Sequence, residues 1–126
     1  MPADQVQEIP NDCWLLRRIS PVHIVHDANT GRRRLSSGAF RDRQMSVDAE
    51  CLMLAEGVGW NFSLRAHTNY FLVRLAAGFA RQQQQTVEHK PVNENRFHTE
   101  VIGRKSSPIC NALRDAVEWV VKPDGV

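Results

Sequence analysis

Apolar residues recur in short runs along this chain of 126 residues, and polar, glycine and proline clusters separate the runs. Cys13–Ile19 is apolar and contains tryptophan and isoleucine, so it predicts a first strand. Gln44–Val47 predicts another strand, and His98–Ile102 alternates as a half-buried strand does. Asp27–Gly31 has the composition of a tight turn.

The middle of the chain predicts a short helix over Ala49–Glu56. Ser46 or Asp48 can cap its first turn, and Gly57 is a natural stop. The helix would follow the early strands in the chain.

The C-terminal part carries the strongest helical signal. Ser107 can cap a helix, and Pro108 fits the first helical position. Six apolar residues then share one helical face: Ile109, Ala112, Leu113, Ala116, Val117 and Val120. We therefore expect one helix from Ser107 to the polar ending at Lys122–Gly125.

Tyr70–Ala80 is the most apolar stretch, and its pattern fits a strand or a helix. We expect a strand, because Gly78 weakens a helix and the aromatic and branched residues favour a sheet. The order of elements predicts one α+β domain over residues 13–126, with a short mixed or antiparallel sheet, a middle helix and a C-terminal helix. Residues 1–12 would form a flexible leader.

Composition narrows the class of protein. No apolar run approaches the ~20 residues of a membrane span, and the polar start of the chain is unlike a secretory signal. Cys13, Cys51 and Cys110 are odd in number and far apart, which indicates free thiols in a reducing compartment. We therefore expect a cytoplasmic protein. The net charge of +2 is too small for nucleic-acid binding through bulk electrostatics.

Positive charge is nevertheless concentrated in one segment. Arg17–Arg43 holds seven arginines against two acids, and Gly31–Phe40 reads GRRRLSSGAF. Guanidinium forks suit phosphate and carboxylate, and serine hydroxyls and glycine amides can complete such a site.

A second segment, Gly103–Ser107, repeats these ingredients just before the predicted C-terminal helix, where the helix dipole favours an anion. If the two segments converge, they form a cleft for a nucleotide or a nucleic-acid phosphate. The expected ligand-binding residues are Arg32, Arg33, Arg34, Ser36, Ser37, Arg104, Lys105 and Ser106. The alternative is a solvated turn and an ordinary helix cap.

Other chemistry has weaker support. His23 and His26 would point to opposite faces of an extended segment, and no third ligand clusters with them, so we expect no metal. Cys51 near a helix start has acidic neighbours that oppose thiolate formation. No phosphate-loop or dinucleotide motif is present, so we expect no cofactor and leave catalytic residues unassigned.

The order LLRRI, HIVHD, GRRRLSSGAF and MSVD, over about residues 14–122, resembles short uncharacterised bacterial proteins, which implies no activity. A looser similarity is to ADP-ribosyltransferase-like domains. That similarity implies NAD held by Arg17 or Arg18 and by Ser36 or Ser37, with Glu100 as the late glutamate.

Three functional hypotheses follow from these patterns. The first is a protein that binds an anionic ligand through the two basic-serine segments. The second is an NAD-dependent transferase. The third is an oligomeric module, without a small ligand, in which the basic segment pairs with the acidic stretch Asp48–Glu56.

Overall fold

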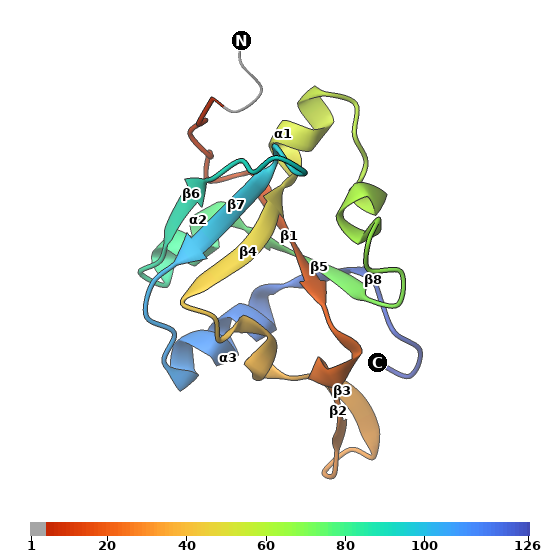
Figure 1. Ribbon diagram of the computed structural model, residues 1–126. Helices are drawn as coiled ribbons and strands as arrows, with labels where there is room; N and C mark the ends of the chain where they lie inside the picture. The colour runs from red at the N-terminus through yellow and green to blue at the C-terminus, as the bar shows by residue number, and fades with distance from the viewer. Residues whose placement is uncertain (1–4) are drawn as a thin grey trace.

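Six antiparallel strands form the main sheet of the computed structural model, which describes residues 5–126 (Figure 1). Their order is β6-β7-β4-β1-β5-β8. The strands are β1 Trp14–Ile19, β4 Gln44–Ala49, β5 Phe71–Ala76, β6 Thr86–His89, β7 His98–Ile102 and β8 Glu118–Val121. A separate hairpin of β2 (Ile24–Asp27) and β3 (Arg32–Leu35) projects from one end. The predicted α+β class is confirmed.

The helices are short. The α-helices are α1 Glu50–Ala55, α2 Ala77–Gln82 and α3 Ser107–Ala116. The 3₁₀ helices are η1 Pro21–His23, η2 Ser37–Phe40 and η3 Trp60–Leu64. Within residues 5–126, no helix has the length and apolar character that crossing a membrane requires.

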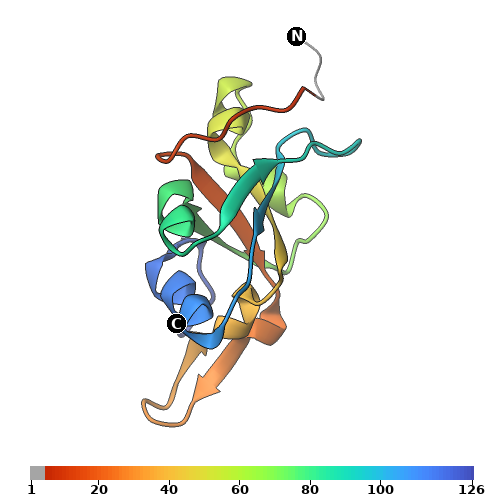
Figure 2. The ribbon, with the colours of Figure 1, turned by 90° about the vertical axis from the view of Figure 1, so that its left-hand side faces the viewer.

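Each face of the sheet carries its own apolar cluster. Side chains such as Leu15 and Val101 on one face pack with Leu113 of α3. Leu16 and Leu72 on the other face pack with Met53 of α1 and with η3. Figure 2 shows α2 and α3 on one side of the sheet and η3 on the other.

Tyr70–Ala80 is only partly the strand that we expected. β5 ends at Ala76, and Ala77–Gln82 forms α2. Gly78 permits close packing here, because a Cβ at this position would lie 3.0 Å from the Cβ of Asn11. Its small size therefore serves a contact with the N-terminal segment, and the inference that Gly78 disfavours a helix is wrong.

The predicted C-terminal helix is too long, because α3 ends at Ala116 and Glu118–Val121 pairs with β5 as β8. Val117 and Val120 thus lie outside the helix whose face they were expected to share. The expected cap of α1 is also wrong: Ala49 occupies the N-cap position and makes no side-chain cap, while Asp48 is buried. Gly57 does follow that helix with a φ of 73°, as a glycine stop requires.

The expected leader covers residues 1–12, of which residues 1–4 lie outside the described part of the chain. The rest packs against the domain. Ile9 is buried, and its carbonyl accepts a hydrogen bond of 2.6 Å from Nη2 of Arg81. The amide of Gln7 donates to Nδ1 of the buried His89 at 2.8 Å.

A disulfide joins Cys13 to Cys51, whose Cα atoms lie 5.4 Å apart. Cys110 is a buried free cysteine. The expectation of three free thiols is therefore wrong, and the argument for a reducing compartment, which depended on it, no longer holds.

Arg17 fills a gap in the sheet. β1 and β4 pair only at Leu15–Ala49 and Leu16–Asp48, and then diverge. In the gap, Nη1 of Arg17 donates to the carbonyl of Ser46 at 3.0 Å, and Nη2 donates to the carbonyl of Ala39 at 3.0 Å. The side chain thus connects β1 to β4 and to η2 through backbone carbonyls. Burial lowers the pKa of Arg17, although Asp42, at 3.3 Å from Nη2, opposes that shift.

We expect Arg17→Met to lower the free energy of unfolding by about 2–4 kcal/mol, because two carbonyls lose their donor. Urea denaturation followed by circular dichroism measures the loss. Arg32→Met is the matched control at an exposed position and should change stability by less than about 0.5 kcal/mol. Equal effects of the two substitutions would contradict the role of Arg17.

The disulfide predicts a thiol count. In denaturant without reductant, one thiol per chain, that of Cys110, should react with a chromogenic disulfide reagent. After reduction all three cysteines should react. Three reactive thiols before reduction would show that the bond does not form.

Candidate anion-binding site

The turn between β2 and β3 sets out the first basic segment. The amide of Asn29 donates to Oδ1 of Asp27 at 2.9 Å, and the amide of Gly31 donates to the carbonyl of Asp27 at 2.8 Å. Gly31 has a φ of 71°, which suits glycine. The chain then returns as β3, so that Arg32–Arg34 occupy a strand.

The three arginines of β3 are exposed but do not point to one place. Successive side chains alternate across a strand, so Arg33 lies on the opposite side of the hairpin from Arg32 and Arg34. Nη1 of Arg33 donates to the carbonyl of Asp124 at 3.0 Å. Nε of Arg34 lies 3.8 Å from Oδ2 of Asp27.

The serine pair has a structural position at the start of η2. The hydroxyl of Ser36 accepts a hydrogen bond of 3.1 Å from the amide of Gly38, and its own amide donates to the carbonyl of His23 at 2.8 Å. Ser37 is the first residue of η2. The Ser36 oxygen therefore caps this short helix.

The second segment meets the chain at Arg43. The amide of Gly103 donates to the Arg43 carbonyl at 3.0 Å. Nζ of Lys105 donates to the carbonyls of Val101, Arg43 and Gly103, at 2.9, 3.2 and 3.3 Å. Ser106 is the N-cap residue of α3, but its side chain makes no cap hydrogen bond.

The two segments approach each other only in part. η2, which begins at Ser37, packs against α3, and Sγ of Cys110 lies 3.6 Å from the Phe40 carbonyl. Arg32–Arg34 instead extend away along the hairpin (Figure 1). The structure thus places Ser37 beside the helix that follows Gly103–Ser107, and the arginines of β3 apart from it.

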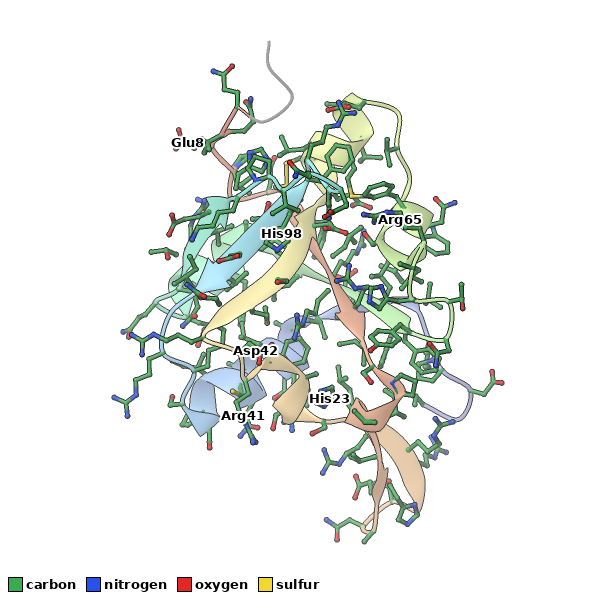
Figure 3. The ribbon with its side chains drawn as sticks, in the orientation of Figure 1. Glu8, His23, Arg41, Asp42, Arg65 and His98 are labelled. Carbon is green, nitrogen blue, oxygen red and sulfur yellow. A yellow bond between two sulfur atoms is a disulfide. The ribbon has the colours of Figure 1, made fainter. Side chains whose placement is uncertain are left out.

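Two arginines outside the GRRRLSSGAF motif also belong to this region. Arg41 and Arg43 follow η2 and are exposed, and Figure 3 shows Arg41 at the same end of the molecule as the hairpin. We call the following six exposed side chains the basic end: Arg32, Arg33, Arg34, Arg41, Arg43 and Arg104. The density of arginine over Arg17–Arg43 was the sequence signal for Arg41 and Arg43.

Most of the basic end lacks acidic partners. Among residues 5–126, no carboxylate lies within 4.0 Å of the guanidinium groups of Arg32, Arg41, Arg43 or Arg104. Asp42, which lies between two of these arginines in sequence, turns to Arg17 instead. The basic end therefore keeps its charge available to solvent.

Of the residues implied by the ADP-ribosyltransferase resemblance, Arg17 and Glu100 lie on opposite faces of the sheet, whereas Arg18 lies on the same face as Glu100. Nη1 of Arg18 donates to the Ser63 carbonyl at 3.4 Å. Arg17 is turned to the η2 side, where backbone carbonyls occupy its donors. Glu100 pairs in register with Ser46 on the opposite face and lies 3.4 Å from Lys90. The NAD-dependent activity stays a prediction.

The acidic stretch of the oligomer hypothesis is also divided. Asp48 is 2% exposed, and it accepts hydrogen bonds from Ser63 at 2.6 Å and from Asn95 at 2.7 Å. Oε1 of Glu56 pairs with Nη1 of Arg96 at 3.0 Å. Asp48 therefore cannot contribute to an acidic surface.

A serine–histidine contact was not predicted from the sequence. Nδ1 of His98 donates to the Lys90 carbonyl at 2.9 Å, because a carbonyl can only accept. Nε2 of the same ring lies 3.2 Å from the hydroxyl oxygen of Ser46 on β4. These contacts join β7 to β4 and to the residue after β6, segments that residue spacing in the sequence does not connect.

Comparison with protein-family models, with curated proteins and with solved structures gave no match.

The partial burial of Lys105 predicts that its side chain titrates at an unusually low pH. Burial lowers the pKa of Lys105 to about 8. The chain has three lysines, so the Lys105 side chain can be followed by NMR. We expect a midpoint near 8, and a midpoint near the ordinary 10.5 would contradict the burial effect.

The same shift predicts how stability varies with pH. Between about 8 and 10.5 the unfolded chain holds a proton on Lys105 that the folded chain has lost. The free energy of unfolding should therefore rise with pH in this window. Lys105→Met lacks this contribution, so the difference between the two unfolding curves isolates it.

Proposed function

We propose that this protein binds a polyanion, namely the phosphate backbone of a nucleic acid, through the basic end. The observation that carries this proposal is the exposure of arginine side chains that no carboxylate within residues 5–126 neutralises. Arginine presents a planar fork of donors that matches phosphate oxygens.

The spread of the arginines favours an extended ligand over a mononucleotide. They come from β3, from the segment after η2 and from the loop before α3. A cavity of about 480 Å³ near the hairpin includes Arg32 and Arg33, but not Arg41, Arg43 or Arg104. A strand with regularly spaced phosphates can contact several such groups at once.

The chemistry of the basic end favours binding that is independent of base sequence. Phe40, the aromatic residue of η2, is buried and cannot stack on a base. Contacts to phosphate carry little sequence information. We therefore expect affinity to follow the charge of the ligand.

A salt titration tests the proposal with a fluorescent single-stranded oligonucleotide. Affinity should fall as salt rises, because bound phosphates release counterions. Arg41→Gln and Arg104→Gln should each weaken binding and reduce the slope of log K against log salt by about 0.7.

Arg96→Gln is the matched control, since Arg96 is exposed but pairs with Glu56 outside the basic end. It should leave affinity and slope unchanged. Binding that is insensitive to salt, or equally weakened by all three substitutions, would overturn the proposal.

A further inference from the structure

A second cavity, of about 560 Å³, lies outside the basic end. Its walls are the end of α1, the 3₁₀ helix η3 and the loop of residues 91–97. The volume lies within the range of about 300–1,000 Å³ that small-molecule sites occupy. Val58, Phe62, Pro91, Val92 and Phe97 supply the apolar part of its lining.

Two aromatic rings support one wall of this cavity, and Phe97 is buried behind Phe62. The rings of Phe62 and Phe97 meet edge to face, with centroids 5.4 Å apart. The guanidinium carbon of Arg65 lies 3.7 Å from the centroid of the Phe62 ring. Arg65 also reaches across to the loop, where Nη2 donates to the Glu94 carbonyl at 3.0 Å. Figure 3 shows Arg65 beside η3.

The buried carboxylate of Asp48 connects two walls of the cavity, η3 and the loop of residues 91–97. One carboxylate oxygen accepts from the hydroxyl of Ser63 on η3, and the other accepts from the side-chain amide of Asn95 on the loop. The side-chain oxygen of Asn95 in turn accepts from the amide of Phe97 at 3.0 Å. These contacts are buried, so the cavity is preformed.

The polar part of the lining carries one close pair of opposite charges. Nη1 of Arg96 lies 3.0 Å from Oε1 of Glu56, and the two side chains are 50% and 42% exposed. An ion pair this exposed contributes little to stability, so it can open at small cost. An α-amino acid carries an ammonium and a carboxylate on one carbon. It can therefore present a carboxylate to Arg96 and an ammonium to Glu56 at the same time.

We propose that this cavity binds a free apolar or aromatic α-amino acid. Its side chain packs on Phe62 and on the exposed Val92, its carboxylate binds Arg96 and its ammonium binds Glu56. The two intermolecular pairs replace the single pair within the protein. This site is separate from the basic end and does not depend on polyanion binding.

Isothermal titration with four probes tests the proposal on the whole chain. L-phenylalanine carries both charges and a ring, 3-phenylpropionate lacks the ammonium, 2-phenylethylamine lacks the carboxylate, and glycine lacks the side chain. L-phenylalanine should bind saturably, and each of the other probes should bind roughly tenfold more weakly or worse, since each loses a charged or apolar contact.

Two substitutions assign the charges. In Glu56→Gln, L-phenylalanine should lose its advantage over 3-phenylpropionate, which should bind at least as well as to the original chain because Arg96 is released. In Arg96→Gln, L-phenylalanine should instead lose its advantage over 2-phenylethylamine. Both residues are exposed, so both variants should keep the fold, which circular dichroism checks.

Arg41→Gln is the matched control and should bind every probe as the original chain does. Absence of saturable L-phenylalanine binding would overturn the proposal, as would equal affinity for the three aromatic probes. So would variants that leave the preference among probes unchanged. Oligonucleotide binding should persist in Glu56→Gln, so failure of one site is distinguishable from failure of the other.

Discussion

The guanidinium of Arg17 holds the sheet together where two of its central strands separate. β1 and β4 share only two register pairs, and beyond them the carbonyls of Ser46 and Ala39 depend on this side chain for donors. The divergence makes room for η2, which packs against α3. Through Ala39 and Asp42, Arg17 thereby also fixes the segment that carries Arg41 and Arg43. One arginine of the Arg17–Arg43 stretch is thus structural and positions others that remain exposed.

Asp48 has the corresponding role on the other face. It pairs in register with Leu16, the residue before Arg17, so its side chain lies on the face of the sheet opposite to that of Arg17. Its two oxygens hold Ser63 and Asn95, which belong to segments far apart in sequence. Most hydrogen bonds of the Arg17 guanidinium, and those of the Asp48 carboxylate to Ser63 and Asn95, are made with neutral groups. This arrangement lets the sheet bury a charge on each face without pairing the two.

Local patterns predicted those parts of the fold that depend on neighbouring residues. The turn at Asp27–Gly31 followed from residue chemistry alone. The position of α3 was also predicted, but the cap expected at Ser107 is wrong, because Ser106 is the N-cap residue and Ser107 is the first residue of the helix. The end of α3 was not predicted, because the apolar spacing continues from Ala116 to Val120 while pairing with β5 imposes a strand. Local pattern and tertiary contact also disagree over Tyr70–Ala80. The apolar pattern continues through this stretch, but contact with Asn11 favours the helix α2 after Ala76.

The site shows the same limit. Sequence alone located the arginine-rich segment, but not which arginines stay free. Which arginines lack an acidic partner depends on the divergence of β1 from β4. In the space between these strands Arg17 is partly buried, and there it pairs with Asp42. Nor did spacing connect Asp48 to Asn95, 47 residues later.

The disulfide between Cys13 and Cys51, which are 38 residues apart in sequence, closes a covalent ring. β1, the projecting hairpin, η2 and β4 all lie inside that ring. A protease that cuts the exposed turn at Asn29 would therefore open the ring without releasing a fragment. The two pieces would stay attached through sulfur as well as through the sheet, and the hairpin could tolerate a nick that would divide an uncrosslinked chain.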